Sequence, residues 1–479
     1  MRTILAEQGG LDFCPQIAIV PDRMPEASNL NSPGPSLWAL LRRLGGTPTR
    51  QRLARGAFWG AVGFALSRGV ALGVSFVLAR LLGQEGFGEY GMVNSTAGMV
   101  GGLAGLGIGA TVVKHVAEFK IADPAKAGRI LALSSAVTWM SALLYAGAFI
   151  TLAPWLAAGV LAAPDLAPLL QISAFTVAFG VINTVQASSL TGCEAFRTNT
   201  GIGVVCSLLQ SALVWLGAWS WGLIGAVGAL AVAMLVTVLL TRIYVRREWR
   251  RFQLHLLWRD ARQEWRVLRD FSLPAFLAGV SVGPVLWGCS AMLANQPDGY
   301  VELGVFNAAN QWQQVIQLLP GLLGTALLPV LSEKCGKGDW LGGFTVMWKM
   351  VKLVAVMAVS LATVLALVSP WIMRGYGESF VAGYWTMVLA VLTATLYAVA
   401  YPVGQLITAS GRMWTGFWMN TGWGVAMLLA SWWMVRWGAE GLAGARLVAY
   451  LFHAGWTFGF VCYLKRRVRP ESISSSGAC

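Results

Sequence analysis

Twelve apolar stretches, each about as long as a bilayer is thick, dominate this sequence. A hydrocarbon core is spanned by about 20 apolar residues in a helix. Stretches of roughly that length run at 57–82, 88–113, 130–152, 166–191, 198–219, 221–245, 271–294, 302–330, 346–373, 381–409, 413–435 and 441–464. Because unpaired backbone groups in lipid cost several kcal/mol each, these stretches must be helical. We predict an all-α polytopic membrane protein with about 12 transmembrane helices.

Composition and the first 50 residues agree with this class. Only 12% of the 479 residues are charged, whereas a soluble domain usually carries about a quarter. Residues 1–50 hold six prolines and no long apolar core. We expect them to form a disordered cytoplasmic tail rather than a signal peptide.

The positive charges predict the topology. If alternate loops are assigned to opposite sides, 30 of the 35 Lys and Arg residues fall on the side of both termini. Basic loops stay in the cytoplasm, so we expect a multi-pass protein of the bacterial inner membrane with both termini inside. The net charge of +14 is then a topology marker, and we expect no nucleic-acid partner.

The largest basic cluster follows the sixth stretch, at the midpoint of the chain. Residues 246–270 mix arginines with tryptophans, which is typical of an amphipathic segment held at the cytoplasmic interface by membrane lipids.

The midpoint also separates two repeats. Glu89, Gly91 and Asn94 match Glu302, Gly304 and Asn307 at an offset of 213. Further along, an offset of 219 aligns six residues with six others: Gln186, Gly192, Gly222, Leu223, Gly225 and Ala226 with Gln405, Gly411, Gly441, Leu442, Gly444 and Ala445. We predict two six-helix lobes, 51–245 and 271–467, followed by a cytoplasmic tail at 468–479, with a site between the lobes as expected for a transporter.

Patterns for catalysis, metals and nucleotides are largely missing. The seven cysteines have no Cys-x-x-Cys spacing, the three histidines stand apart, and no phosphate-binding loop with Gly-Lys-Ser or Gly-Lys-Thr is present. We therefore predict a transporter rather than an enzyme, with no catalytic residue, metal or cofactor.

Two arginines inside the predicted spans carry the strongest functional signal. Arg68 lies eleven residues into its stretch, near mid-membrane. A guanidinium there costs about 2.5–3.5 kcal/mol even on insertion scales, so it should face a hydrated cavity or an anion. The alternative is an arginine bonded to carbonyls of neighbouring helices. Arg446 lies nearer the outer end of the last stretch, where it can extend toward the interface.

The stretch at 302–330 has an unusual polar stripe. Six amides fall within an arc of about 160° at 100° per residue: Asn307, Asn310, Gln311, Gln313, Gln314 and Gln317. Such a stripe either joins helices by hydrogen bonds or lines a cavity where it could meet sugar hydroxyls. All 21 acidic residues fall in tails, loops or span ends. We expect Arg68, Arg446 and the stripe, Gln313 excepted, to bind a substrate with phosphate and carbohydrate parts.

Residues 79–90, Ala-Arg-Leu-Leu-Gly-Gln-Glu-Gly-Phe-Gly-Glu-Tyr, resemble the Ala-Arg-Leu-Leu-Gly-Pro-x-x-Phe-Gly-x-Tyr stretch of polysaccharide-biosynthesis flippases. These are the Wzx-like branch of the multidrug/oligosaccharidyl-lipid/polysaccharide (MOP) exporter superfamily. Leu328–Ser332, Tyr376–Phe380 and Gly411 are similar to its second half, although Gln84 replaces the usual proline.

This resemblance implies two lobes that rock about a central cavity and carry an undecaprenyl-pyrophosphate-linked oligosaccharide to the outer leaflet. It also implies partners in a polysaccharide polymerase and chain-length machinery. Arg68 is the candidate for the phosphates. We expect the motif residues to set turns and gate contacts rather than to bind substrate: Arg80, Glu85, Gly88, Glu89 and Gly411.

Two other functions stay open. A cation-coupled multidrug or small-molecule exporter of the same superfamily commonly carries a buried carboxylate, which the predicted spans lack. A polysaccharide polymerase or ligase should carry a long external loop with catalytic groups, whereas Asp165 is the only charge in the longest external loop here.

Overall fold

The computed structural model describes residues 48–272, 276 and 281–474. Leu53–Cys479 form one compact unit, and of the separate unit that ends at Arg52 only the first residues of a helix are described. The helices are α2 (Pro48–Ala104), α3 (Ile108–Ala122), α4 (Pro124–Trp155), α5 (Ala167–Gly192), α6 (Phe196–Arg251), α7 (Trp265–Val267), α9 (Val282–Ala294), α10 (Gly299–Gly336), α11 (Trp340–Leu367), α12 (Ser369–Tyr376), α13 (Tyr384–Ala409), α14 (Met413–Met434) and α15 (Gly438–Ser474).

The all-α membrane fold is confirmed. Among the described residues, seven helical stretches are long and apolar enough to cross a membrane. Three of them each hold two predicted spans: Ala65–Ala104, Phe196–Arg251 and Trp414–Arg466. The 38-residue α10 contains the span predicted at 302–330. The shorter apolar helix α9 covers only the second half of the span predicted at 271–294, of which residues 273–275 and 277–280 lie outside the described residues. The predicted disordered tail lies outside the described residues except for 48–50.

Backbone breaks separate the spans that share a helix. α2 turns at Gly83, whose φ of 72° suits glycine, and α6 turns at Trp221 and Gly222. The predicted span 88–113 is too long, because left-handed residues at Leu106 and Gly107 end α2 and start α3. The span predicted at 346–373 is likewise divided between α11 and α12.

Side-chain caps fix some of the helix starts. The carboxylate of Asp339 accepts a hydrogen bond from the backbone N–H of Gly342 at 2.8 Å, which satisfies an orphan donor at the start of α11. Hydrogen bonds from Lys334 and from that N–H hold the pKa of the Asp339 carboxyl below its ordinary value. Asp123 caps α4 in the same way through the N–H of Lys126.

The basic segment 246–270 is not one continuous helix. α6 ends at Arg251, and short turns follow from Ala261 onward. Leu254, Ala261 and Leu268 are buried there, while Trp258 and Trp265 are exposed. The segment thus has a buried apolar side and an exposed aromatic side. The predicted domain boundaries stay predictions.

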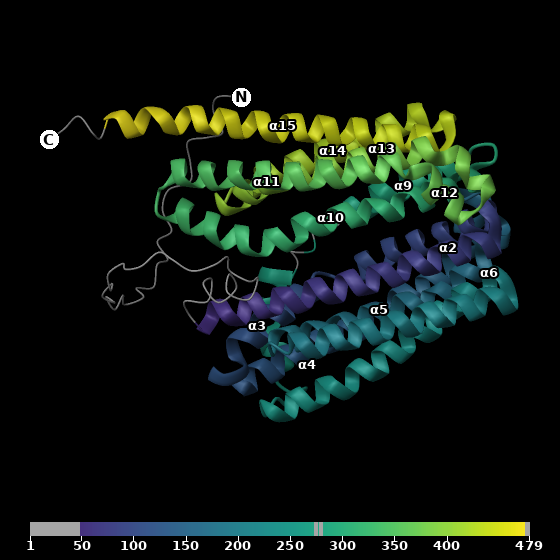
Figure 1. The fold of residues 1–479 in the computed structure, drawn as a ribbon. Helices are drawn as coiled ribbons and strands as arrows, with labels where there is room; N and C mark the ends of the chain where they lie inside the picture. The colour runs from purple at the N-terminus through teal and green to yellow at the C-terminus, as the bar shows by residue number, and fades with distance from the viewer. Residues whose placement is uncertain (1–47, 273–275, 277–280, 475–479) are drawn as a thin grey trace, which may run out of the picture. The chain divides into compact units, whose positions relative to one another are not determined.

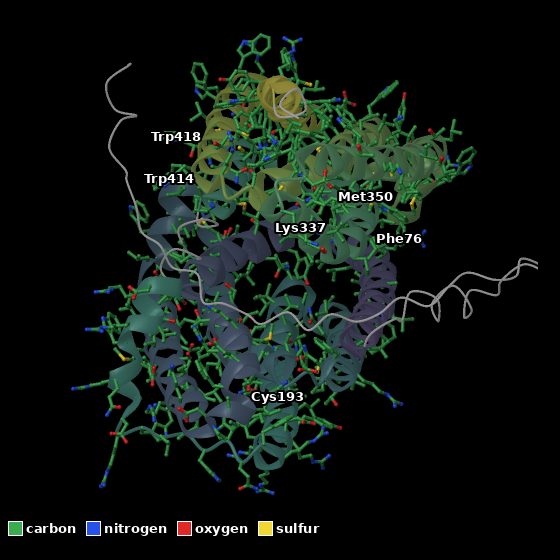
Figure 2. The ribbon with its side chains drawn as sticks, turned by 90° about the vertical axis from the view of Figure 1, so that its left-hand side faces the viewer. Phe76, Cys193, Lys337, Met350, Trp414 and Trp418 are labelled. Carbon is green, nitrogen blue, oxygen red and sulfur yellow. The ribbon has the colours of Figure 1, made fainter. Side chains whose placement is uncertain are left out.

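The helices form two groups (Figure 1). α4, α5 and α6 pack together, and α13 packs against α10, α11 and α15. Trp414 and Trp418 lie on the outer side of α14 (Figure 2) and are 75% and 59% exposed. Trp432 and Trp433 are exposed at the other end of the same helix. Aromatic residues at both ends are typical of a membrane-spanning helix.

The apolar core shows where the two groups meet. One large cluster joins residues of both groups near the turns between paired spans, among them Phe87, Leu303 and Tyr376. At the opposite end each group has its own cluster, one around Val116 and one around Met347. The groups therefore share a core at one end only.

Candidate functional site

A first cavity of about 440 Å³ lies among α2, α6 and α10, and we call it the α2–α10 cavity. Its polar wall contains Arg68, Ser75, Asn94, Ser95, Gln210, Ser211, Asn307, Asn310, Gln311 and Gln314. Leu78, Phe87 and Val214 add apolar surface. The cavity thus combines one cation with amides and hydroxyls, and its lining contains no Asp or Glu.

Arg68 projects from α2 onto α10. Its Nη2 donates hydrogen bonds to the backbone oxygen of Gln311 at 2.8 Å and to Gln311 Oε1 at 2.6 Å. Its Nε is buried and has no partner among the described residues. The guanidinium is therefore held by neutral groups and keeps donor capacity for a ligand.

A second cavity of about 440 Å³ lies on the other side of α10, and we call it the α10–α15 cavity. Helices α9, α10, α13, α14 and α15 supply its lining. The polar and aromatic members are Asn310, Gln313, Gln314, Gln317, Tyr397, Asn420, Trp423, Arg446, Tyr450 and His453. It too is lined without Asp or Glu.

Arg446 is 8% exposed and is also held by amides of α10. Its Nη1 donates to Asn310 Oδ1 at 2.6 Å and to Gln313 Oε1 at 3.0 Å. The guanidinium lies 5.4 Å from the centre of the Phe306 ring, a cation–π distance. In the described part of the chain neither Arg446 nor Arg68 forms an ion pair.

The amide stripe of α10 thus forms a wall shared by the two cavities. Asn310 and Gln314, in the middle of the stripe, line both. Asn307 and Gln311 face the α2–α10 cavity only, whereas Gln313 and Gln317 face the α10–α15 cavity only. The structure therefore brings all predicted substrate-binding residues to α10, but divides them between two cavities.

Two of the predicted gate residues, Arg80 and Gly88, lie apart from both linings, at the end where the two helix groups share a core. Arg80 Nε donates to the backbone oxygen of Gly375 at 2.8 Å, and Gln84 Nε2 donates to that of Ser379 at 2.8 Å. A Cβ atom on Gly88 would overlap the backbone oxygen of Tyr300. α2 and α10 can cross this closely only because residue 88 is glycine.

The other motif residues have different positions. Glu85 is exposed and Glu89 half-buried one turn further along α2. Gly411, with φ +72°, follows α13, where the N–H of Gly411 and that of Arg412 bond the carbonyls of Thr408 and Ile407. This is a Schellman motif, so Gly411 sets a helix end.

Several lining residues were missed by the sequence reasoning. Gln210 is an amide near the middle of the predicted span 198–219, a signal that could have been used. Tyr397 and Tyr450 gave no such signal, because a tyrosine in a membrane helix is common at any depth near an interface. No cluster of metal-ligating residues was found among the described residues.

Comparison with known proteins places this geometry in a family. The family model described as "Polysaccharide biosynthesis protein" matches residues 53–334. The EPS I polysaccharide export inner membrane protein EpsE of Ralstonia solanacearum is 28% identical over 201 residues, which are 40% of this chain and 45% of EpsE. The chain thus spans about half the length of the curated relatives it matches.

Solved structures share the fold. A MATE family multidrug resistance transporter of the MOP superfamily, in an inward-facing conformation, aligns with a TM-score of 0.69 at 14% identity, covering 85% of this chain and 96% of that one. The lipid II flippase MurJ, in an inward closed conformation, aligns with a TM-score of 0.66 at 12% identity, covering 84% and 86%. The solved structures show that the chain has the fold of these transporters, and the family model, which matches more than half of its length, shows that the chain belongs to the polysaccharide biosynthesis protein family.

Proposed function

We propose that the protein is a transporter that flips an undecaprenyl-pyrophosphate-linked oligosaccharide to the outer leaflet of the bacterial inner membrane for surface polysaccharide synthesis. The observation that carries the proposal is Arg68, a cation held only by neutral groups in a cavity lined by amides and hydroxyls. The polymerase and chain-length machinery that use the flipped product are its proposed partners.

The chemistry of the α2–α10 cavity suits the two parts of such a substrate. A diphosphate offers charged oxygens that bind a guanidinium more strongly than a neutral amide does, so it can replace Gln311 as the partner of Arg68. The amides of Gln311, Asn307 and Gln314 then have donors and acceptors available for sugar hydroxyls. The α10–α15 cavity offers Arg446 and further amides for more of the glycan.

The relatives support this assignment by what they are named for. EpsE is named for polysaccharide export and for the inner membrane, and MurJ for flipping lipid II. The distribution of the core supports alternating access, because two helix groups joined at one end can rock about the cavities. The distribution of Lys and Arg over the loops supports an orientation with the joined end outside and both termini in the cytoplasm.

The lining also argues against the alternatives. A cation exporter commonly uses a buried carboxylate to bind its cargo and coupling ion, and neither cavity lining contains one. A polymerase or ligase needs catalytic acids or bases beside the substrate. The α2–α10 cavity, to which we assign the diphosphate, has no Asp, Glu or His in its lining.

The test is to delete the gene and locate the lipid-linked oligosaccharide. We expect it to accumulate on the inner leaflet while surface glycan is lost, and wild-type protein to restore export. Arg68→Gln should restore about tenfold less export than the wild-type protein, which is the effect expected when a charge-assisted hydrogen bond is lost. Arg247→Gln, which removes an exposed arginine stacked on Tyr244 at the end of α6, is the matched control and should restore export fully.

Two outcomes contradict the proposal. Unchanged surface glycan together with lost drug resistance in the deletion strain would point to a multidrug exporter. Full export by Arg68→Gln, at normal membrane levels, would mean that Arg68 serves only to join α2 to α10.

A further inference from the structure

A small cavity with a mainly apolar lining and a few polar side chains lies away from α10, on the side of α4, α5 and α6 that the basic segment covers. Its volume is about 50 Å³, enough for about four water-sized groups. The lining residues are Ser135, Thr138, Trp139, Ile182, Val185, Gln186, Arg242, Trp249, Leu256 and Trp258. It shares none of them with the α2–α10 or the α10–α15 cavity.

Arg242 supplies the charge of this small cavity. Its guanidinium lies 5.5 Å from the ring centre of Trp249, whose Nε1 is fixed by a 2.7 Å hydrogen bond to Ser189 Oγ. Among the described residues, no carboxylate pairs with Arg242. A fixed guanidinium without a counter-charge is suited to an oxyanion.

Two buried polar groups in the lining also have no partner. Gln186 is 7% exposed and its Oε1 is unbonded, and Thr138 is 2% exposed and its Oγ1 is unbonded. Unsatisfied buried polar atoms are costly and uncommon. An amide oxygen accepts and a threonine hydroxyl donates or accepts, so the pair is suited to hydroxyl groups.

The surroundings point to a lipid. Trp139 and Trp258 border the cavity and are 52% and 54% exposed. Arg242 opens the run of arginines at the end of α6 that the topology assigns to the cytoplasmic interface. Exposed tryptophans beside arginine at that level are typical of contact with lipid headgroups.

We propose that this cavity binds the headgroup of an anionic phospholipid that also carries hydroxyls, as phosphatidylglycerol does. The phosphate accepts hydrogen bonds from Arg242, and the glycerol hydroxyls reach Gln186 and Thr138. The bound lipid thereby joins α4, α5, α6 and the segment around Leu256. The site does not depend on what the protein transports.

The test measures lipid binding to the purified full chain by native mass spectrometry. Added lipids are phosphatidylglycerol, phosphatidic acid, which lacks the glycerol hydroxyls, and phosphatidylcholine, which lacks the net charge. We expect phosphatidylglycerol to bind most tightly. Arg242→Gln should weaken it about tenfold, whereas Arg247→Gln, the neighbouring arginine outside the cavity, should leave it unchanged.

Gln186→Leu tests the hydroxyl contact separately. It should lower the affinity for phosphatidylglycerol to that for phosphatidic acid without changing the latter, and Arg242→Lys should recover part of the binding. Equal losses for Arg242→Gln and Arg247→Gln would overturn the proposal in favour of diffuse attraction to a basic surface. Equal binding of phosphatidylglycerol and phosphatidic acid to the wild type would overturn it as well.

Discussion

At the scale of single residues, two arginines share one chemistry and differ in setting. Arg68 is half-buried and bonds across 243 residues of sequence, from α2 to Gln311 of α10. Arg446 is almost fully buried and bonds across 136 residues, from α15 to Asn310 of α10. In the proposed function the substrate competes for the partner of Arg68, whereas the bonds of Arg446 hold α15 to α10.

This difference predicts different stabilities for matched variants. Arg446→Leu leaves the oxygens of Asn310 and Gln313 without their donor, and a buried unsatisfied polar group costs about 1–3 kcal/mol. Arg68→Leu should cost clearly less, because Arg68 and Gln311 are both half-buried, whereas Gln313 is only 5% exposed. The midpoints of thermal unfolding of the two variants in detergent measure this difference in stability. Equal midpoints would show that Arg446 is not required to hold α15.

Both arginines could be identified from the sequence, because a charged residue inside a long apolar stretch can be recognised without a structure. Their hydrogen-bond partners could not be identified in this way. No sequence pattern links position 68 to position 311. The arc of the α10 stripe also does not show which of its amides face which of the two cavities. Gln210 and Tyr450 reach the cavities only through helix packing.

At the scale of helices, the structure shifts part of the predicted repeat by one turn. Gly222 and Gly438 both have positive φ at the start of a span, which gives an offset of 216 rather than 219. Gly225 and Gly441 then correspond, and each closely approaches a carbonyl of the preceding helix. Glycine recurs every third residue in both segments, so a shift of three still pairs glycine with glycine.

The ends of α5 and α13 also show that residue identity can align the two repeats incorrectly. Gly411 and Glu194 occupy the equivalent left-handed position in two Schellman motifs, with φ of +72° and +60°. The sequence pairs Gly411 with Gly192 instead, which lies within α5 and packs closely on Val116. Residue identity misleads here because Glu194 takes a conformation that usually requires glycine.

The crossing of α2 and α10 makes a testable case at this scale. Gly88→Ala places a methyl group against the carbonyl of Tyr300, and overpacking of this kind costs about 1–3 kcal/mol. We expect the fraction of molecules in which the joined end is open to rise about tenfold or more, and we expect export to fall. Ser75→Cys, a conservative change at a position that is 5% exposed and hydrogen-bonded to Tyr376, should then react faster with an impermeant thiol reagent added outside.

Gly98→Ala is the control, because a Cβ atom at that position has no neighbour within 4 Å. If both variants export equally and label equally, the close approach at Gly88 is not part of the gate.

At the scale of the whole molecule, the proposed export by rocking requires the joined end to separate during each cycle. The hydrogen bonds of Arg80 and Gln84 to the opposite lobe are short but few, and apolar contacts around Phe87 and Tyr376 complete the joint. Hydrogen bonds contribute about 0.5–1.5 kcal/mol net each, so this closure is reversible. A covalent link across the same contact removes that reversibility.

We therefore expect a cross-link between the lobes to stop export. Gln84→Cys with Ser379→Cys, in a chain whose seven native cysteines are replaced, should be joined by a short reducible bifunctional thiol reagent. Export should fall below about a tenth of its uncross-linked rate, because a protein that is held closed at this end cannot reach the conformation that is open there. Reduction of the link should restore export.

The matched control is Lys334→Cys with Asp339→Cys, whose native side chains lie 2.7 Å apart. This variant should export normally when it is cross-linked. Export that continues through the inter-lobe link would mean that the substrate crosses without separation of this end, and the rocking mechanism would be wrong.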